Sequence, residues 1–192
     1  MAYPIAHPEV MKRASKVLAL NPVFLDTETT GIGLNDVVIE VAVVDREGQV
    51  LFDSLVNPQR PIPEDSSKVH GITDEMVQNA PVFSQVWADL EQILRNRVIG
   101  IYNAEFDMRL LKQSVLLSEL SWNIKENQAF CVMKLFAAWY GEWNKRHSDF
   151  KSQKLEFAGH FCGIELPNSH HALDDALLTA AVMAYIANYE GN

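Results

Sequence analysis

The chain has only two cysteines in 192 residues and no long run of uncharged apolar residues. Cys131 and Cys162 lie far apart and match no CxxC spacing, which excludes a CxxC metal or redox site. We expect two buried thiols in a reducing compartment. The absence of an apolar run that could cross a bilayer excludes a membrane-spanning helix. Three basic residues interrupt the first 20 positions, so the layout of a signal peptide is also missing. We therefore expect a soluble, cytoplasmic protein without a membrane partner.

The chain also has fewer basic than acidic residues. The 16 Lys and Arg stand against 25 Asp and Glu, which leaves a formal net charge of −9 at pH 7. This charge argues against a protein that holds duplex DNA by broad neutralisation of phosphates, because that mode needs clustered Lys and Arg. The charge does not exclude an enzyme that acts on nucleic acid, because the formal count omits the positive charge of bound divalent cations.

The length and the composition allow one domain. With 48% hydrophobic residues, 192 residues can form one sizeable core but are few for two full domains. We find no internal repeat, low-complexity tract or linker that would divide the chain. We therefore predict a single domain over residues 1–192, in which residues 1–20 form an N-terminal extension with an amphipathic helix from 8 to 20.

Strand-like segments come first along the chain, and helical segments follow. Runs rich in Val, Leu and Ile predict strands over 23–26, 37–44 and 49–56, and turn residues at 45–48 predict an antiparallel connection. After a proline-rich loop, helical spacing alternates with short apolar runs. We predict helices over 82–94, 105–117, 133–141, 152–162 and 171–188, and strands over 98–102 and 130–133. This order is typical of an α/β fold with a mixed five-stranded sheet whose first three strands form an antiparallel meander.

Two acids, Asp26 and Glu28, stand at the end of the first predicted strand. Residues two apart in a strand point to the same side, so these acids share a face with Phe24, while Val23 and Leu25 occupy the other face. Both faces begin with apolar residues, which predicts a covered central strand. An ionised carboxylate removed from water is penalised unless it is paired or bound to a metal. A strand that simply ends in solvated acids is the alternative.

A third acid, Asp107, lies early in a predicted helix that Asn103 could cap. Leu110, Leu111 and Ser114 follow at helical spacing, which places Asp107 on the apolar stripe rather than on the solvated face. A favourable interaction of the carboxylate with the helix N-terminus is the alternative explanation.

The last predicted helix begins near a histidine and two adjacent acids. Asp174 and Asp175 point about 100° apart around a helix, so we do not expect both in one site. His170 precedes Asp175 by five residues and must lie at or before the helix start to approach the same site. An N-cap at Asn168 or Ser169 would allow this. A second histidine directly follows His170, and spacing alone does not decide between the two.

Together these segments resemble the DEDDh family of 3′ to 5′ exonucleases, in particular the proofreading epsilon subunit of bacterial replicative DNA polymerase and its stand-alone relatives. Three motifs occur in order: Asp-x-Glu-Thr-Thr-Gly at 26–31, Asn-Ala-x-Phe-Asp at 103–107 and His-x-Ala-Leu-x-Asp at 170–175. The segment Val69-His70-Gly71-Ile72-Thr73 also looks like that family. The resemblance runs nearly end to end and implies a ribonuclease H-like fold.

The resemblance implies a metal site with four acidic ligands, Asp26, Glu28, Asp107 and Asp175. These would hold two divalent metal ions, and ligation by oxygen alone suits Mg²⁺ or Mn²⁺ rather than zinc. The family's histidine precedes its last aspartate by five residues, which selects His170 and Asp175 over His171 and Asp174. His170 thereby matches the general base that takes a proton from the attacking water.

The resemblance also implies contacts to the terminal nucleotide, by Thr29, Thr30, Gly31 and Ile32. Backbone N–H groups and hydroxyls in this segment can contact sugar and phosphate without reading a base. His70, Asn103 and Phe106 are expected to support the site.

The implied function is a 3′ to 5′ exonuclease that releases nucleoside 5′-monophosphates from nucleic acid 3′ ends, with single-stranded DNA preferred over RNA. RNA 3′-end trimming of the ribonuclease T type is the closest alternative, since nothing in the sequence shows whether a 2′-hydroxyl is accepted. A non-catalytic, polymerase-associated binding module is an alternative from another class, and the complete set of acids argues against it. Only 17 residues follow Asp175, so we expect a stand-alone enzyme without the tail by which epsilon attaches to its polymerase. The sequence leaves two protein partners possible, a polymerase and a second copy of the chain.

One stretch departs from the acidic character of the chain. It combines basic and aromatic residues, namely Lys134, Trp139, Tyr140, Trp143, Lys145, Arg146, Lys151 and Lys154. Such a combination can bind phosphates and stack the bases of a single strand. The alternative is aromatic packing beneath a surface helix, with the basic residues merely solvated.

Overall fold

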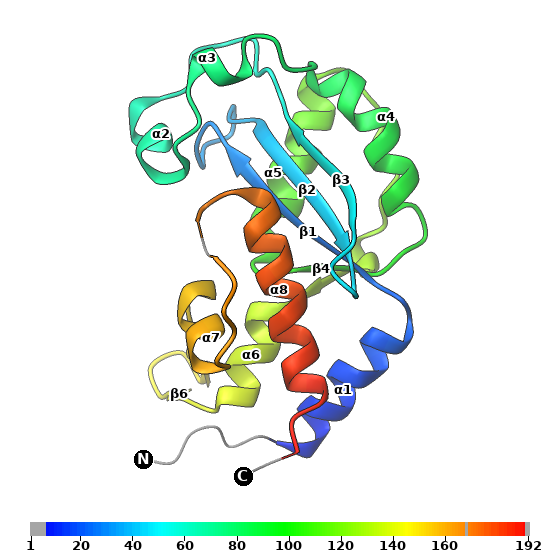
Figure 1. Ribbon diagram of the computed structural model, residues 1–192, viewed down its shortest axis with the longest axis vertical. Coiled ribbons are helices and arrows are strands. Elements are labelled where there is room, and N and C mark those ends of the chain that lie inside the picture. The colour runs from blue at the N-terminus through cyan, green and yellow to red at the C-terminus, as the bar shows by residue number, and fades with distance from the viewer. Residues whose placement is uncertain (1–6, 168, 191–192) are drawn as a thin grey trace.

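The computed structural model describes residues 7–167 and 169–190 (Figure 1). Its centre is a five-stranded sheet in the order β3-β2-β1-β4-β5, and a separate two-stranded sheet joins β6 and β7. The strands of the large sheet are β1 (Val23–Thr29), β2 (Val38–Asp45), β3 (Val50–Leu55), β4 (Ile99–Ile101) and β5 (Ala129–Cys131). The small sheet consists of β6 (Trp143–Asn144) and β7 (Asp149–Phe150).

The large sheet is mixed. β1 pairs antiparallel with β2 and parallel with β4, while β2 pairs antiparallel with β3 and β4 pairs parallel with β5. At the turn between β2 and β3, Gly48 has a φ of 82° and its N–H donates a hydrogen bond to the Asp45 carbonyl. The predicted five-stranded mixed sheet with an initial antiparallel meander is therefore confirmed.

Helices cover both faces of this sheet (Figure 1). One face carries α4 (Phe83–Leu94) and α5 (Ala104–Leu117). The other face carries α1 (Pro8–Ala19), α6 (Val132–Tyr140), α7 (Leu155–Phe161) and α8 (Ala172–Ala187). Along β1, Phe24 packs toward the α8 side, whereas Val23 and Leu25 pack toward α4 and α5. β1 is therefore the covered central strand that its sequence predicts.

Short elements lie where no helix or strand is predicted. They are α2 (Glu64–His70), α3 (Asp74–Val77), the 3₁₀ turn η1 (Glu126–Gln128) and the β6–β7 hairpin. None exceeds seven residues, so helical or strand periodicity has too few positions in which to appear. The predicted helix over 152–162 begins three residues later, at Leu155, because residues 151–154 form no regular element and Lys154 is the extended N-cap residue.

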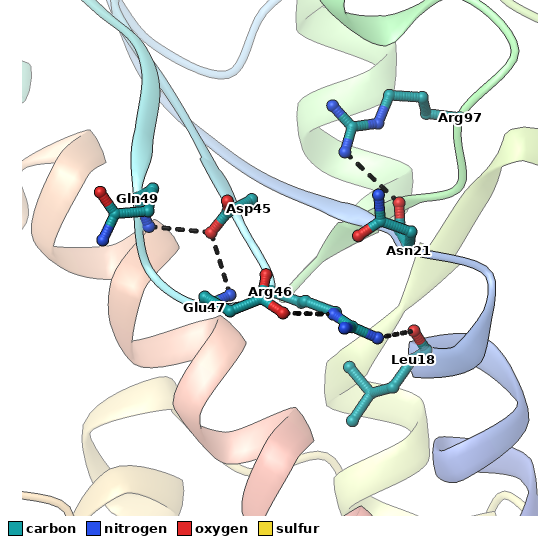
Figure 2. A network of polar contacts seen from close by, with 7 residues as sticks. All are labelled: Leu18, Asn21, Asp45, Arg46, Glu47, Gln49 and Arg97. Carbon is teal, nitrogen blue, oxygen red and sulfur yellow. Dashed lines mark hydrogen bonds and ion pairs between the residues drawn. The ribbon is translucent and has the colours of Figure 1, made fainter.

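The end of α1 is tied to the β2–β3 turn and to the segment before β4 (Figure 2). Arg46 donates a hydrogen bond to the Leu18 carbonyl at 3.2 Å, and Arg97 donates to the Asn21 carbonyl at 3.4 Å. The Asp45 carboxylate accepts two backbone N–H groups of the turn at 2.9 and 2.8 Å. These bonds fix the helix of the N-terminal extension onto the domain. Residues 1–6 of that predicted extension lie outside the described residues.

The two cysteines differ in burial. Both are free, but only Cys162 is buried, whereas Cys131 is partly exposed and its Sγ donates to the Tyr102 carbonyl at 3.3 Å. The prediction of two buried thiols is therefore wrong for Cys131, because β5 is an edge strand of the sheet. Within residues 7–167 and 169–190, no helix is both long and apolar enough to cross a membrane.

Candidate active site

Asp26 and Glu28 lie on the face of β1 that α8 covers. Both are partly buried, and Phe24 on the same face is fully buried in the core beneath them. The pairing of β1 with β2 shifts register between Glu28 and Thr29. A β-bulge of this kind bends a strand and re-aims its side chains. The strand therefore presents two carboxylates just before the chain turns away from the sheet.

Asp175 approaches these two acids from the first turn of α8, where it is buried. Carboxylate oxygens of Asp26, Glu28 and Asp175 lie within 4.8 Å of one another. The position of α8 depends on close packing against α7, since a Cβ added to Gly159 would lie only 2.8 Å from the Leu178 side chain. Two elements far apart in the sequence thus form one three-acid cluster.

Asp107 reaches this region from the other side of the sheet. It is buried in the first turn of α5, and its Oδ1 accepts a hydrogen bond from Thr27 Oγ1 at 2.9 Å. Because Thr27 lies between Asp26 and Glu28 in the strand, its side chain points to the opposite face. The predicted place of Asp107 on the apolar helix stripe is confirmed. The structure brings three of the four predicted acids together, and the charge of the fourth, Asp107, also acts on Asp26.

Burial and mutual repulsion dominate the electrostatics of the metal-free protein. Burial, reinforced by the charge of Asp175, raises the pKa of Glu28 to about 8. Burial also raises the pKa of Asp107 to about 7, against the hydrogen bond from Thr27, which lowers it. The pKa of Asp26 is well above its usual value because of burial first and the neighbouring acids second. Among the described residues, neither Asp26 nor Glu28 forms an ion pair with a basic side chain.

Such an arrangement suits a divalent cation. Three carboxylate oxygens converge, their charges repel one another, and no nitrogen or sulfur ligand belongs to the cluster found among the described residues. Hard cations such as Mg²⁺ and Mn²⁺ prefer oxygen ligands of this type. The donor set therefore fits the metal ions that the sequence predicts.

Adding Mg²⁺ or Mn²⁺ to metal-stripped protein should raise its Tm by about 5 °C at an ion concentration near 100 times the Kd. The reason is that the ion binds the folded acids and relieves their repulsion. Differential scanning fluorimetry at matched ionic strength measures this shift. Glu28→Gln removes one ligand and one buried ionisable group, so the metal-free Tm should not fall and the metal-induced shift should shrink. An undiminished shift in this variant would contradict the assignment.

The two adjacent histidines have different surroundings. His171 is the N-cap residue of α8, and its Nδ1 lies 3.5 Å from Glu40 Oε1. His170 precedes the helix with a φ of 55° and is exposed. The predicted N-cap at Ser169 is wrong because the helix starts two residues later, and Asn168 lies outside the described residues. His170 nevertheless lies before the helix start, as an approach to Asp175 requires.

Glu40 is a site residue that the sequence analysis does not identify. It stands opposite Glu28 in the pairing of β1 with β2 and is buried. Its Oε2 accepts the N–H of Ala172 at 2.8 Å, while its Oε1 faces His171. Burial raises the pKa of Glu40, and these two partners lower it. The carboxylate thus holds the start of α8 against the sheet. An acid in the otherwise apolar run of β2 is the signal that marks it in the sequence.

The segment predicted to receive a nucleotide forms a tight loop after β1. Thr29 Oγ1 donates to the Gly31 carbonyl at 2.8 Å, and Thr30 Oγ1 donates to the Asp36 carboxylate at 2.8 Å. A Cβ added at Gly31 would lie 2.7 Å from Asp36, so the loop requires glycine here. The loop itself uses both threonine hydroxyls. Ile32 is 78% exposed and leaves its side chain available to a ligand.

The three supporting residues of the sequence analysis lie around the acids. His70 is buried at the end of α2, its Nδ1 accepts the N–H of Ile72 at 3.0 Å, and burial lowers its pKa. Asn103 is the N-cap residue of α5 and is exposed, without a side-chain capping bond to the described helix. Phe106 is partly buried, with the Arg109 guanidinium 5.7 Å from its ring centroid.

A pocket of about 530 Å³ opens beside Asp175. His170, Asp175 and Asn103 line one part of it, and the segment 152–156 lines another. Its volume lies in the usual range of small-ligand sites. His170 and Asp175 are thus exposed to the same pocket, whereas His171 does not line it.

Part of the basic and aromatic stretch has a structural role. Trp139 is fully buried in the aromatic core, and Tyr140 stacks on Phe136 with ring centroids 5.8 Å apart. Lys134 pairs with Glu105. The idea that Trp139 and Tyr140 contact a substrate is replaced by the packing alternative, because α6 directs these rings into the core. Lys134 is exposed, and its contact with a substrate stays a prediction. Trp143 and the basic residues after it lie outside that core.

The fold and the acidic cluster define a class of nuclease, and comparison with known proteins identifies the family. A family model described as "Exonuclease" (RNase T) matches residues 23–183. The chain therefore belongs to the RNase T and DnaQ-like exonuclease family, whose members depend on divalent metal ions.

Two relatives and one solved structure illustrate this membership. The chain is 33% identical over 189 residues to an uncharacterized exonuclease, CP81, of Escherichia phage 186, with 95% of this chain and 96% of the phage protein covered. It is 32% identical to the DNA polymerase III epsilon subunit of Treponema pallidum, over 79% of this chain and 69% of that subunit. Exonuclease X in complex with 5′ overhanging duplex DNA is similar with a TM-score of 0.65 and 25% identity, over 88% of this chain and 93% of that one. This likeness confirms the ribonuclease H-like fold. Some curated relatives are much longer, and the chain spans 22% and 11% of two of them.

Proposed function

We propose that the chain is a 3′ to 5′ exonuclease that hydrolyses phosphodiester bonds at the 3′ ends of single-stranded DNA and releases nucleoside 5′-monophosphates. The observation that carries the proposal is the convergence of three carboxylates within 4.8 Å beside a pocket that His170 lines. Membership in an exonuclease family gives this arrangement its reaction class.

The acids and the histidine have separate roles in the proposed reaction. Asp26, Glu28 and Asp175, with Asp107 behind them, hold two divalent metal ions. When bound, such ions supply positive charge to the attacking and leaving oxygens of an in-line displacement at phosphorus. His170 accepts the proton of the attacking water, since it lines the pocket that Asp175 also lines. Asp107 receives a hydrogen bond from Thr27, which fixes its orientation behind Asp26.

Contacts to the terminal nucleotide come from the residues around the pocket. Thr29, Thr30, Gly31 and Ile32 shape the loop after β1, and Ile32 packs against the terminal nucleotide with its exposed side chain. Asn103 lies in the wall of the pocket beside His170. His70 and Phe106 hold these segments in place from behind.

DNA is the preferred substrate in this proposal. Exonuclease X is described in complex with DNA, and the Treponema relative is a DNA polymerase subunit. RNA trimming is the alternative function, and a comparison of DNA and RNA oligonucleotides as substrates tests it.

We expect the wild-type protein with Mg²⁺ or Mn²⁺ to shorten a 5′-labelled single-stranded DNA oligonucleotide one nucleotide at a time. A 3′-labelled copy should lose its label in the first turnover, as a nucleoside 5′-monophosphate identified by chromatography. Denaturing gels of equal-length DNA and RNA, run side by side, compare the two substrates. Loss of a 5′ label first would refute the direction, and faster cleavage of RNA would replace DNA by RNA as the substrate.

A further inference from the structure

The β6–β7 hairpin is a surface feature that the proposed reaction does not use. Trp143 pairs with Phe150 and Asn144 with Asp149 across the two short strands. The four residues between the strands, 145–148, are all exposed. The hairpin extends beyond the ends of α6 and α7 on the α8 side of the sheet (Figure 1).

The hairpin carries exposed aromatic rings. Trp143 is 52% exposed and Phe150 is 37% exposed, with ring centroids 5.1 Å apart and planes at 84°. This edge-to-face pair differs from Trp139, which is fully buried four residues earlier. Phe157 at the start of α7 is 38% exposed and adds to the apolar surface. Large rings held half open to solvent offer faces on which flat groups can stack.

The hairpin and the residues beside it are also locally basic in an acidic chain. Residues 142–154 contain four Lys or Arg and two acids, although the whole chain has a net charge of −9. Lys151 pairs with Glu142 at 3.1 Å. Lys145 and Arg146 at the tip are exposed, and neither has an ion-pair partner in the described part of the chain. Their charges are therefore available to an anionic ligand.

The hairpin is continuous with the pocket of the candidate active site. Phe150 is two residues from Ser152, which lines that pocket, so at most about 7 Å of extended chain separates them. The Gln153 carbonyl accepts a hydrogen bond from the Tyr102 hydroxyl at 3.0 Å. Glu142 accepts bonds from both Lys151 and Gln153. These bonds anchor the hairpin base to the pocket wall and fix the direction in which the hairpin leaves it.

We propose that the β6–β7 hairpin binds the single strand that leads away from the scissile bond. Trp143 stacks on a base, with Phe150 supporting its ring, and Lys145 and Arg146 contact phosphates. Rings beside cations bind single-stranded nucleic acid without reading its sequence, which suits an exonuclease that must accept every base. The inference rests on the proposed function and assigns a longer stretch of substrate to the same site.

Two variants test this proposal: Trp143→Ala, and the neutralised pair Lys145→Gln with Arg146→Gln. For each, kcat/KM is measured on a single-stranded 20-nucleotide DNA and on the dinucleotide d(TpT), which has one phosphodiester and no further strand for the hairpin to bind. The kcat/KM on the 20-nucleotide DNA divided by the kcat/KM on d(TpT) should fall about tenfold for Trp143→Ala. The reason is a higher KM for the 20-nucleotide DNA. For the neutralised pair, the slope of log kcat/KM against log salt on the long DNA should become shallower by about 1.4 for two lost phosphate contacts.

The matched control is Lys12→Gln with Lys16→Gln on α1, which removes the same charge from exposed positions outside the hairpin. This control should keep the wild-type ratio and salt slope. An unchanged ratio and slope in the hairpin variants would overturn the inference, as would an equal loss on both substrates. Failure of the wild-type protein to cleave either substrate would instead refute the proposed function. Because Lys145 and Arg146 are exposed at a turn, their neutralisation tests the proposal even if Trp143→Ala loses stability.

Discussion

Replacement of Asp26 by asparagine should lower the exonuclease rate by at least about 1,000-fold while the fold survives. Asp26 lies where β1 ends, within 4.8 Å of Glu28 and Asp175 through their carboxylate oxygens. Loss of a metal ligand at this place removes several kcal/mol of transition-state stabilisation, and about 4 kcal/mol corresponds to 1,000-fold. Asparagine has the same shape and no charge. The metal-free Tm should therefore stay equal or rise, because a buried, repelled carboxylate is gone.

The matched control for this experiment is Asp174→Asn. Asp174 also lies in the first turn of α8, but it accepts a hydrogen bond from Ser169 and does not belong to the three-acid cluster. Its replacement should leave the rate within a few-fold of wild type. Release of mononucleotides from a 3′-labelled oligonucleotide measures both rates. Persistent activity in Asp26→Asn would show that the site is misassigned and would favour a non-catalytic binding role.

The second large effect is expected at His170. A positioned general base contributes about 100-fold to 10,000-fold to a rate, so His170→Asn should lower kcat by at least about 100-fold. Asparagine is preferable to alanine here because His170 has a φ of 55°, and asparagine tolerates this left-handed conformation better than alanine. Single-turnover cleavage of the DNA oligonucleotide measures the chemical step without product release.

His171→Asn is the matched control for His170→Asn. His171 faces Glu40 rather than the pocket, so its replacement should change kcat only a few-fold, together with a lower Tm from the weakened start of α8. A large loss of kcat in His171→Asn and a small one in His170→Asn would instead assign the proton transfer to His171. Circular dichroism of both variants separates loss of chemistry from loss of fold.

The arrangement of the large elements follows from patterns that are local in the sequence. The runs of Val, Leu and Ile in β2 and β3, separated by a turn with Gly48, predict the meander, and helical spacing predicts α4, α5 and α8 close to their observed bounds. The sequence patterns do not predict α2 and α3, because both helices are short. Their place depends on buried contacts of Ile72 and Val77 with Ile39 of β2, which no local pattern records.

The aromatic residues between 134 and 154 show where composition alone fails. Trp139 and Trp143 are four residues apart and would share one face of a continuous helix, yet one is fully buried and the other half exposed. The difference arises because α6 ends at Tyr140 and Gly141 adopts a φ of 86°. The chain then leaves the core and forms the hairpin.

Local sequence patterns identify the acids and the direction in which each side chain points. The period of two in a strand places Asp26 and Glu28 on one face, and the period of the helix places Asp107 on a buried stripe, because both follow from backbone geometry. The way in which these side chains meet depends on the packing of distant elements. The packing of α8 on the sheet brings Asp175 to the acids of β1, and Asp107 accepts a hydrogen bond from Thr27. His171 contacts Glu40, whereas His170 lines the pocket. These relations join segments up to 149 residues apart, and such contacts arise from packing in three dimensions rather than from spacing along the chain.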